Sequence, residues 1–203
     1  MVNIKDYISS FPLLLNHLKK ELPWNITPNL AQILIKIIAN LNPSEFEINE
    51  GMAIHRSAII EHNVTFKSPV IILNNSFIAA NTYFREGVFI DKFVKIGPGT
   101  EVKSSIICSN TSLAHLNYIG NSIIGSNVNF EAGSIAANHY NEKKEKEIKV
   151  IYKGKTISTG VNKFGSLIGD NSKVGANAVL SPGTILAKNS IIKRLELVEQ
   201  IKD

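Results

Sequence analysis

Large apolar residues recur at every sixth position through the middle of the chain. A helix spaces its apolar residues three and four apart, and a half-buried strand spaces them two apart, so neither explains this period. The period favours short strands separated by turns, in which each flat side of a three-sided coil contributes one inward residue. The row begins at Ile48 and runs through Ile54, Ile60, Phe66, Ile72, Ile78, Phe84, Ile90, Ile96 and Val102. With small slips it continues at Ile107, Leu113, Ile119, Ile124, Phe130 and Ala136, and it resumes at Ile168, Val174, Leu180 and Leu186.

Turn-forming residues accompany this row. Glycine follows a row position in Ile96-Gly97, Ile119-Gly120, Ile124-Gly125, Ile168-Gly169 and Val174-Gly175, and asparagine also recurs near the expected corners. Both residue types accept the backbone conformations that tight corners need. The sequence therefore predicts an all-β solenoid, a parallel β-helix, over residues 47–192. The alternatives are a right-handed parallel β-helix, whose coils are usually longer and less regular, and a β-sandwich, which has turn signals about every 8–12 residues.

Two segments lie outside the repeat. Residues 3–41 predict two helices, the first ended by Pro23 and the second opened by Thr27-Pro28 as N-cap and first helical residue. We expect residues 1–46 to form a helical cap over the open end of the solenoid, where they would cover unpaired strand edges; contact with a partner is the alternative. Residues 193–203 are expected to be a C-terminal tail.

The second segment is an insertion at 138–164 that breaks the period and is rich in charge. Loops of this length inside compact folds are usually functional or disordered. Its I-K-V-I-Y-K-G-K-T-I stretch alternates around a Lys-Gly turn, which indicates a small hairpin. A solvated excursion is the alternative, and we favour a functional role because polar residues that could carry chemistry lie beside it in the sequence.

Composition narrows the function classes only a little. The 203 residues carry a net charge of +5, which favours anionic partners, but no basic run is interleaved with aromatics as on a nucleic-acid-binding surface. No apolar stretch approaches the roughly 20 residues that cross a bilayer, and the first residues lack a signal-peptide pattern. Cys108 is the only cysteine, so an intrachain disulfide is excluded. We expect a cytoplasmic protein that binds neither nucleic acid nor membrane.

The stretch 112–138 contains H-L-N-Y-I-G-N-S-I-I-G-S-N-V-N-F, and F-G-S-L-I-G-D-N follows later. With these motifs the chain resembles, from Arg85 to Pro182, the acetyltransferase domain of the glucosamine-1-phosphate acetyltransferase and archaeal sugar-1-phosphate nucleotidylyltransferase family. The resemblance implies a left-handed winding, the hexapeptide-repeat fold, acetyl-CoA as co-substrate, an amino-sugar 1-phosphate as acceptor, and a homotrimer with shared active sites. The chain contains no Gly-rich nucleotide loop followed by a βαβ pattern, so the nucleotidylyltransferase half is not expected here.

The resemblance also implies residue roles. His115 falls on the general base, and the substrate-binding positions fall on Arg85, Lys103, Tyr118, Asn129, Asn138 and Lys163. Independently, an imidazole that titrates near neutral pH suits removal of a proton from an amine, while arginine and lysine suit a phosphate. Arg85 and Lys103 are 18 residues apart, so three hexads should bring them to the same side of successive coils.

Some residues depart from the family pattern. Glu131 stands where relatives commonly have glycine, His139 where they commonly have tyrosine, and the repeat ends soon after Leu186. We therefore name no residue for the CoA phosphates. The alternative function is a non-catalytic sugar-phosphate-binding or assembly module that retains the fold. A zinc enzyme of the γ-carbonic-anhydrase kind is a third hypothesis, but the five histidines show no close pair at ligand spacing, so no metal is expected.

Overall fold

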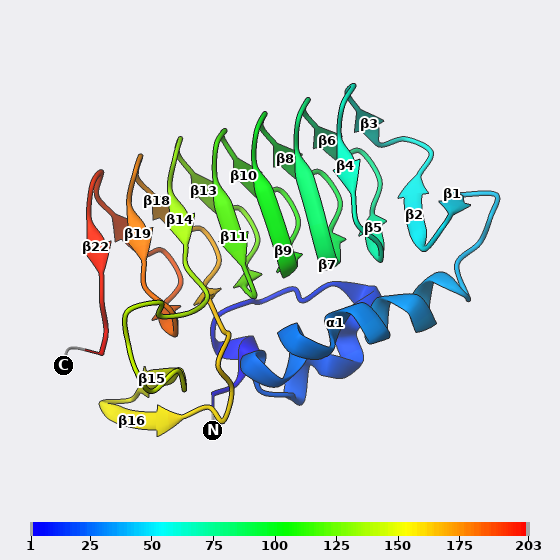
Figure 1. The fold of residues 1–203 in the computed structure, drawn as a ribbon. Coiled ribbons are helices and arrows are strands. Elements are labelled where there is room, and N and C mark those ends of the chain that lie inside the picture. The colour runs from blue at the N-terminus through cyan, green and yellow to red at the C-terminus, as the bar shows by residue number, and fades with distance from the viewer. Residues whose placement is uncertain (1, 202–203) are drawn as a thin grey trace.

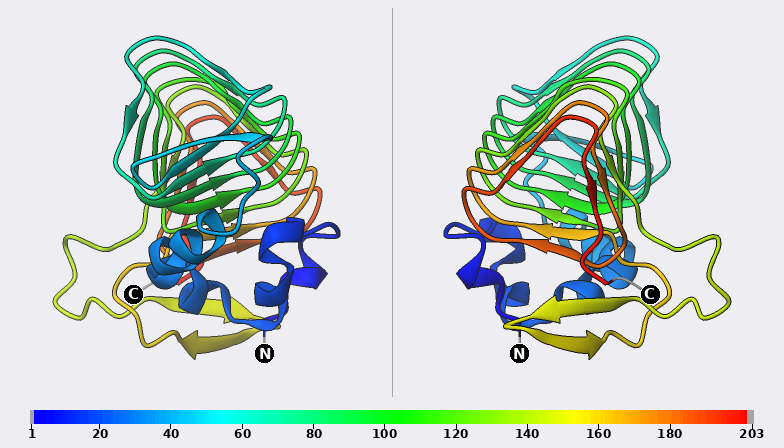
Figure 2. Two further views of the ribbon diagram at one scale, coloured as in Figure 1. Left: turned by 90° about the vertical axis from the view of Figure 1, so that its right-hand side faces the viewer. Right: turned by 90° about the vertical axis from the view of Figure 1, so that its left-hand side faces the viewer.

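The computed structural model describes residues 2–201, and their strands wind into a left-handed three-sided solenoid (Figures 1 and 2). Successive coils pair in parallel to form two sheets. One sheet has seven strands, which make the rear face of the prism: β3 (Ile59–Ile60), β6 (Phe77–Ile78), β8 (Lys95–Ile96), β10 (Ser112–Leu113), β13 (Asn129–Phe130), β18 (Lys173–Val174) and β21 (Ile191–Ile192).

The other sheet has thirteen strands and bends around a corner, so it forms the two remaining faces. The front face consists of β4 (Thr65–Phe66), the first parts of β7 (Tyr83–Ile90) and β9 (Glu101–Ile107), β11 (Tyr118–Gly120), β14 (Ile135–Ala136), β19 (Val179–Leu180) and β22 (Leu197–Val198). The helix-covered face consists of β2 (Met52–His55), β5 (Val70–Ile72), the second parts of β7 and β9, β12 (Ile123–Ile124), β17 (Ser166–Ile168) and β20 (Thr184–Leu186). At its edge β1 (Phe46–Asn49) pairs with β2 in antiparallel orientation.

The six-residue row fills the inside of the prism, as predicted. From Ile54 to Leu186 the row residues pack together in one apolar cluster, which Ile192 and Val198 extend. Ile48 is the exception: it lies in β1, which turns back antiparallel, and 38% of its surface is exposed. The coils also reach further than predicted, because β22 pairs with β19 and so places Leu197 and Val198 in a last coil and not in a tail. The rest of that predicted tail includes residues 202–203, which lie outside the described residues.

Asparagine and glycine have different roles in the coils. Asparagine supplies many of the left-handed corner residues, with φ between 44° and 62°, as at Asn121 and Asn189. The glycines that follow the row serve a different purpose from the predicted one, because they allow close approach between coils. A Cβ on Gly97 would overlap the backbone of Ala114, and one on Gly169 would lie 2.5 Å from the backbone nitrogen of Lys188.

The N-terminal segment does not cap the open end of the solenoid. It forms two 3-10 helices, η1 (Ile4–Asp6) and η2 (Leu13–Lys20), and one α-helix, α1 (Pro23–Ile38), which lie along the helix-covered face (Figures 1 and 2). The predicted helix start at Thr27-Pro28 is also wrong. The helix begins with Pro23 at its first position, after Leu22 as N-cap, and Pro28 lies inside it.

The reason for this placement is a second apolar layer on the outside of the helix-covered face. Outward-pointing Ile71, Phe89 and Ile106 are fully buried against Ile26, Leu30, Leu34 and their neighbours. Burying a large apolar side chain contributes about 1.5–3 kcal/mol, so a face lined with them needs a cover more than the open end does. The N-terminal segment therefore completes the core.

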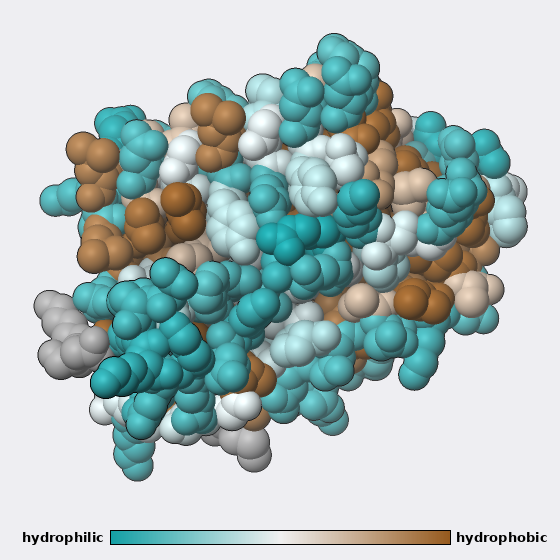
Figure 3. All heavy atoms as spheres, in the orientation of Figure 1, coloured by the Kyte–Doolittle hydropathy of each residue, from teal (hydrophilic) through white to brown (hydrophobic). Residues whose placement is uncertain are grey.

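The insertion contains the predicted hairpin. Its strands β15 (Lys149–Tyr152) and β16 (Lys155–Ser158) pair in antiparallel orientation around Lys153-Gly154. Ile148 and Val150 are buried in the same outer apolar layer, so the hairpin extends the cover made by α1. The surface at the insertion itself is mostly hydrophilic in the view of Figure 3. Over residues 2–201, no helix is both long enough and apolar enough to span a bilayer.

Gly87 fixes how closely α1 approaches the prism, and replacing it by alanine is expected to lower the free energy of unfolding by about 1–3 kcal/mol. Its φ is +90°, and a Cβ there would lie 2.7 Å from the backbone nitrogen of Ala31 in α1. Denaturant unfolding monitored by circular dichroism measures the change. Gly154→Ala is the matched control, because Gly154 also has positive φ (+74°) but has no atom within 4 Å of an added Cβ. Equal losses in the two variants would contradict close docking of α1 on Gly87.

Candidate functional site

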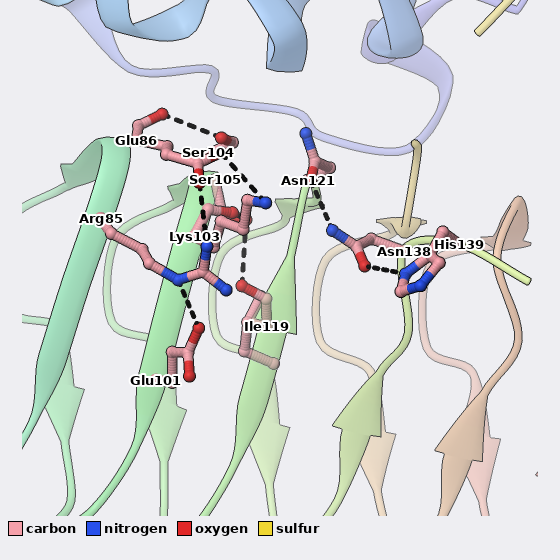
Figure 4. Close-up of polar contacts among 10 residues, drawn as sticks. All are labelled: Arg85, Glu86, Glu101, Lys103, Ser104, Ser105, Ile119, Asn121, Asn138 and His139. Carbon is pink, nitrogen blue, oxygen red and sulfur yellow. Dashed lines mark hydrogen bonds and ion pairs between the residues drawn. The ribbon is translucent and has the colours of Figure 1, made fainter. Parts of the chain in front are cut away.

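Arg85 and Lys103 lie in register on the front face, beside the corner that leads to the helix-covered face. The Cα atoms of Arg85 in β7 and Lys103 in β9 are direct partners across the parallel pair. Their neighbours Phe84 and Val102 point into the core, so by the alternation of a strand both cations point outward. The prediction that a spacing of 18 residues places them on the same side of successive coils is confirmed (Figure 4).

Two carboxylates that the sequence analysis did not single out hold these cations. Glu86 accepts a hydrogen bond from Arg85 Nη1 at 2.9 Å through Oε1, and its Oε2 lies 3.0 Å from Lys103 Nζ. Glu101 accepts from Arg85 Nε at 2.7 Å, and this bond raises the pKa of Arg85. Burial alone would raise the pKa of Glu86, but Lys103 and Arg85 lower it, so the carboxylate stays ionised.

A second polar group continues along the same face, one and two coils further on. Asn138 is almost fully buried; its Nδ2 donates to Asn121 Oδ1 at 2.6 Å, and its Oδ1 lies 3.2 Å from His139 Nδ1. Tyr118 is hydrogen-bonded to Asn138, and burial, followed by the charge of Glu101, raises the pKa of its phenol. The phenol is therefore a hydrogen-bond donor at neutral pH.

Gly120 makes room for this group. A Cβ at Gly120 would lie 2.7 Å from Tyr118 Oη and 2.9 Å from Asn138 Cγ. The missing side chain lets the tyrosine and the asparagine meet over the strand.

A cavity of about 420 Å³ opens at the same corner, and it is lined by residues of the solenoid, of α1 and of the insertion. Glu86, Ser104 and Asn121 line it from three successive coils, Pro28 lines it from α1, and Val161, Asn162 and Lys163 line it from the end of the insertion. The insertion returns next to where it left, since Phe164 N donates to Asn138 O at 2.9 Å and Gly165 N to Asn121 O at 3.0 Å. This return brings Lys163 to the corner that already holds Glu86 and Lys103.

Two predicted site residues stand apart from this group. Asn129 belongs to β13 on the rear face, where it lines a separate cavity of about 490 Å³ together with Glu131, Lys173 and Arg194. His115 is exposed at the corner between β10 and β11 and does not line the cavity at Lys163. The structure thus brings five of the predicted residues to one side of the prism: Arg85, Lys103, Tyr118, Asn138 and Lys163. His115 lies three residues before Tyr118, at the corner where the coil of Tyr118 enters the front face.

Glu131, which departs from the family pattern, belongs to the rear cavity. Its Oε2 accepts from Ala176 N at 2.9 Å and from Arg194 Nε at 3.0 Å, and its Oε1 accepts from Arg194 Nη2 at 3.1 Å. The bond from the Ala176 backbone and then the pairing with Arg194 lower the pKa of Glu131. Within residues 2–201, no group of three or more histidine, cysteine, aspartate or glutamate side chains is placed to hold a metal ion.

Comparison with known proteins gives relatives of one kind. No family model matches the chain. A bifunctional sugar-1-phosphate nucleotidylyltransferase/acetyltransferase from Sulfurisphaera tokodaii is 37% identical over 167 residues, which are 79% of this chain and 41% of the relative. The bifunctional protein GlmU of Methanococcus vannielii is 35% identical over 162 residues, 71% of this chain and 38% of the relative. The GlmU protein of Methanocaldococcus jannaschii is 32% identical over 190 residues, 88% of this chain and 44% of the relative.

Among solved structures, a hexapeptide transferase family protein from Anaplasma phagocytophilum covers 74% of this chain and 79% of its own at 18% identity, and its TM-score of 0.29 is too low to bear on the fold. The chain spans about two fifths of the length of the curated relatives it matches. With the hexapeptide-type solenoid and this level of identity, the chain is homologous to the acetyltransferase-like part of the bifunctional sugar-1-phosphate nucleotidylyltransferase/acetyltransferases.

Proposed function

We propose that this protein is an acyltransferase that moves the acetyl group of acetyl-CoA to the amine of an amino-sugar 1-phosphate, such as glucosamine-1-phosphate. The observation that carries the proposal is the register of Arg85 with Lys103 beside Tyr118 and Asn138 on one outer face. The names of the relatives support the same chemistry. Such a reaction belongs to nucleotide-sugar synthesis, and we place it in the cytoplasm, where acetyl-CoA is available.

The chemistry of each side chain suggests which part of the substrate it binds. A guanidinium offers a planar fork and an ammonium a point charge, and together Arg85 and Lys103 suit a phosphate. Lys163 adds a third cation at the same corner. Tyr118 and Asn138 are proposed to offer a phenol and an amide to the sugar hydroxyl groups, and Gly120 lets these two side chains meet over the strand.

His115 is proposed as the general base. Only a neutral amine attacks a thioester, so the amine must lose a proton, and an imidazole accepts one near neutral pH. His115 stands three positions before Tyr118 in the same coil, and its exposed ring is open to a ligand that extends along the front face. Hydrogen-bond donors near the thioester oxygen would stabilise the charge that develops there.

A homotrimer with shared sites is part of the proposal. Arg85 and Lys103 lie on the front face, whereas Asn129 lies on the rear face of the same prism. One chain therefore does not present both sets of side chains to one small ligand. If Asn129 contacts the substrate, as the resemblance implies, it does so from a neighbouring copy, and this argument supports the shared site.

The test is an assay of thiol release from acetyl-CoA in the presence of glucosamine-1-phosphate, with mass spectrometry of the product. We expect the product to gain one acetyl group on nitrogen. Glucosamine without the phosphate is expected to have a far higher KM, because it forgoes the contacts to Arg85 and Lys103, and N-acetylglucosamine-1-phosphate is expected to be inert because its amine is blocked. Equal thiol release with glucosamine-1-phosphate, with glucosamine and with N-acetylglucosamine-1-phosphate would contradict the proposal.

The second candidate is a sugar-phosphate-binding or assembly module without catalysis. The observation that favours it is the ion pair of Glu131 with Arg194, which places a carboxylate in the rear cavity. Calorimetry separates the two candidates. Binding of glucosamine-1-phosphate without binding of acetyl-CoA supports the module, whereas tight binding of acetyl-CoA supports the enzyme.

A further inference from the structure

The two cations assigned to the phosphate already have an anion between them. One oxygen of Glu86 lies 2.9 Å from Arg85 Nη1 and the other lies 3.0 Å from Lys103 Nζ (Figure 4). A single carboxylate thus bridges both side chains, as a phosphate would. Glu86 follows Arg85 directly in the chain, so this bridge is a local feature of β7.

The backbone of Glu86 is held by neighbouring elements, whereas its carboxylate is held by the two cations. Ser104 Oγ donates to Glu86 O at 2.9 Å, and Gly87, the next residue, lies against α1. Glu86 itself holds a left-handed conformation with φ of 58°, which a residue other than glycine adopts at a cost. Its side chain is 54% exposed and borders the cavity of about 420 Å³, so it can rotate into water.

Lys103 explains why this pair of cations needs an anion. Its side chain is only 7% exposed, so most of its length is out of water. A buried ammonium is costly to leave without a partner. Any anion that leaves Lys103 must therefore be replaced by another. A ligand phosphate that binds here would thus take the place of the Glu86 carboxylate.

We propose that Glu86 is an internal anion that occupies the Arg85–Lys103 pair and is displaced by the phosphate of the ligand, so that it sets the specificity of the site. This inference rests on the proposed function. An anion with one charge gains little by replacing a carboxylate that is already attached to the chain. A phosphate dianion brings more charge and more acceptor oxygens, so it wins the exchange. The site thereby selects phosphorylated over carboxylated ligands.

The experiment measures binding of inorganic phosphate and of acetate to the full chain by calorimetry. Glu86→Gln keeps the shape of the side chain and removes its charge. We expect Glu86→Gln to bind phosphate at least about tenfold more tightly than wild type, the change expected when one charge-assisted competitor is lost. Acetate is expected to bind poorly to wild type and to gain at least as much affinity in Glu86→Gln. The control is Glu199→Gln, which removes one exposed carboxylate from the C-terminal end of the solenoid and is expected to leave both affinities unchanged.

Unchanged or weaker phosphate binding by Glu86→Gln would overturn the inference, because Glu86 would then be neutral to the ligand or would hold the cations in place for it. If the variant unfolds, Glu86→Asp tests the same point: its shorter carboxylate reaches the pair less well, so tighter phosphate binding is again expected and unchanged binding again contradicts. Tighter phosphate binding in an enzyme-inactive protein leaves the inference standing and removes the proposed function. If the protein transfers acetyl groups but Glu86→Gln changes neither the phosphate affinity nor the KM, the proposed function stands and the inference about Glu86 is wrong.

Discussion

Replacement of His115 by alanine is expected to lower kcat for acetyl transfer about 10²–10⁴-fold, the range that a general base contributes. The KM for the sugar phosphate should change little, because the phosphate contacts at Arg85 and Lys103 are untouched. The ring of His115 is exposed, so its loss should not alter stability, and steady-state kinetics on a variant with unchanged thermal unfolding measure the effect. A lower kcat with an unchanged KM indicates a group that acts only in the transition state.

His139 provides the control for this assignment. Its Nδ1 lies 3.2 Å from Asn138 Oδ1, and Asn138 is hydrogen-bonded to Tyr118, so its imidazole contacts this polar group within a single chain. We expect His139→Ala to keep a kcat within a few fold of wild type. The opposite pattern, full activity in His115→Ala and loss in His139→Ala, would transfer the role of base to His139.

Phe89→Ala is expected to lower the free energy of unfolding by about 3–5 kcal/mol. Phe89 is fully buried in the outer layer between the helix-covered face and the N-terminal segment, so its truncation leaves a cavity at that joint. Urea unfolding measures the change. Phe93→Ala is the matched control, because Phe93 lies at a corner with 45% of its surface exposed, and its loss should cost less than about 1 kcal/mol. Similar small losses in both variants would mean that the N-terminal segment adds little to the core.

The solenoid could be predicted from the sequence because its interior allows little choice. Every coil must place a large apolar residue at the same point of each side, so the row from Ile54 to Leu186 is visible without any tertiary knowledge. The position of the N-terminal segment could not be predicted in this way, because an amphipathic helix does not specify which surface it covers. A signal was nevertheless present in neighbouring apolar pairs such as Phe89-Ile90 and Ile123-Ile124, since strands buried on both faces lose their alternation.

The candidate site was predictable where it depends on coil length and not where it depends on side-chain pairing. The spacing of Arg85 and Lys103 equals one full coil, so their register follows from the repeat. The bridging role of Glu86 depends instead on a left-handed backbone at a corner and on the rotamers of three side chains, which no periodicity encodes. Lys163 was placed by resemblance alone, because a long insertion separates it from the other cations.

Sealing one side of a three-sided rod with its own chain restricts how identical rods can associate. The covered side is no longer a sheet surface, so direct contact between sheets is left to the other two sides, which carry different residues. A two-fold pairing would set one of these sides against its own copy, whereas a closed ring sets unlike sides against each other and repeats that contact at every joint. In a ring, the front face that carries Arg85 in one copy would lie against the rear face that carries Asn129 in the next, and every joint would be equivalent.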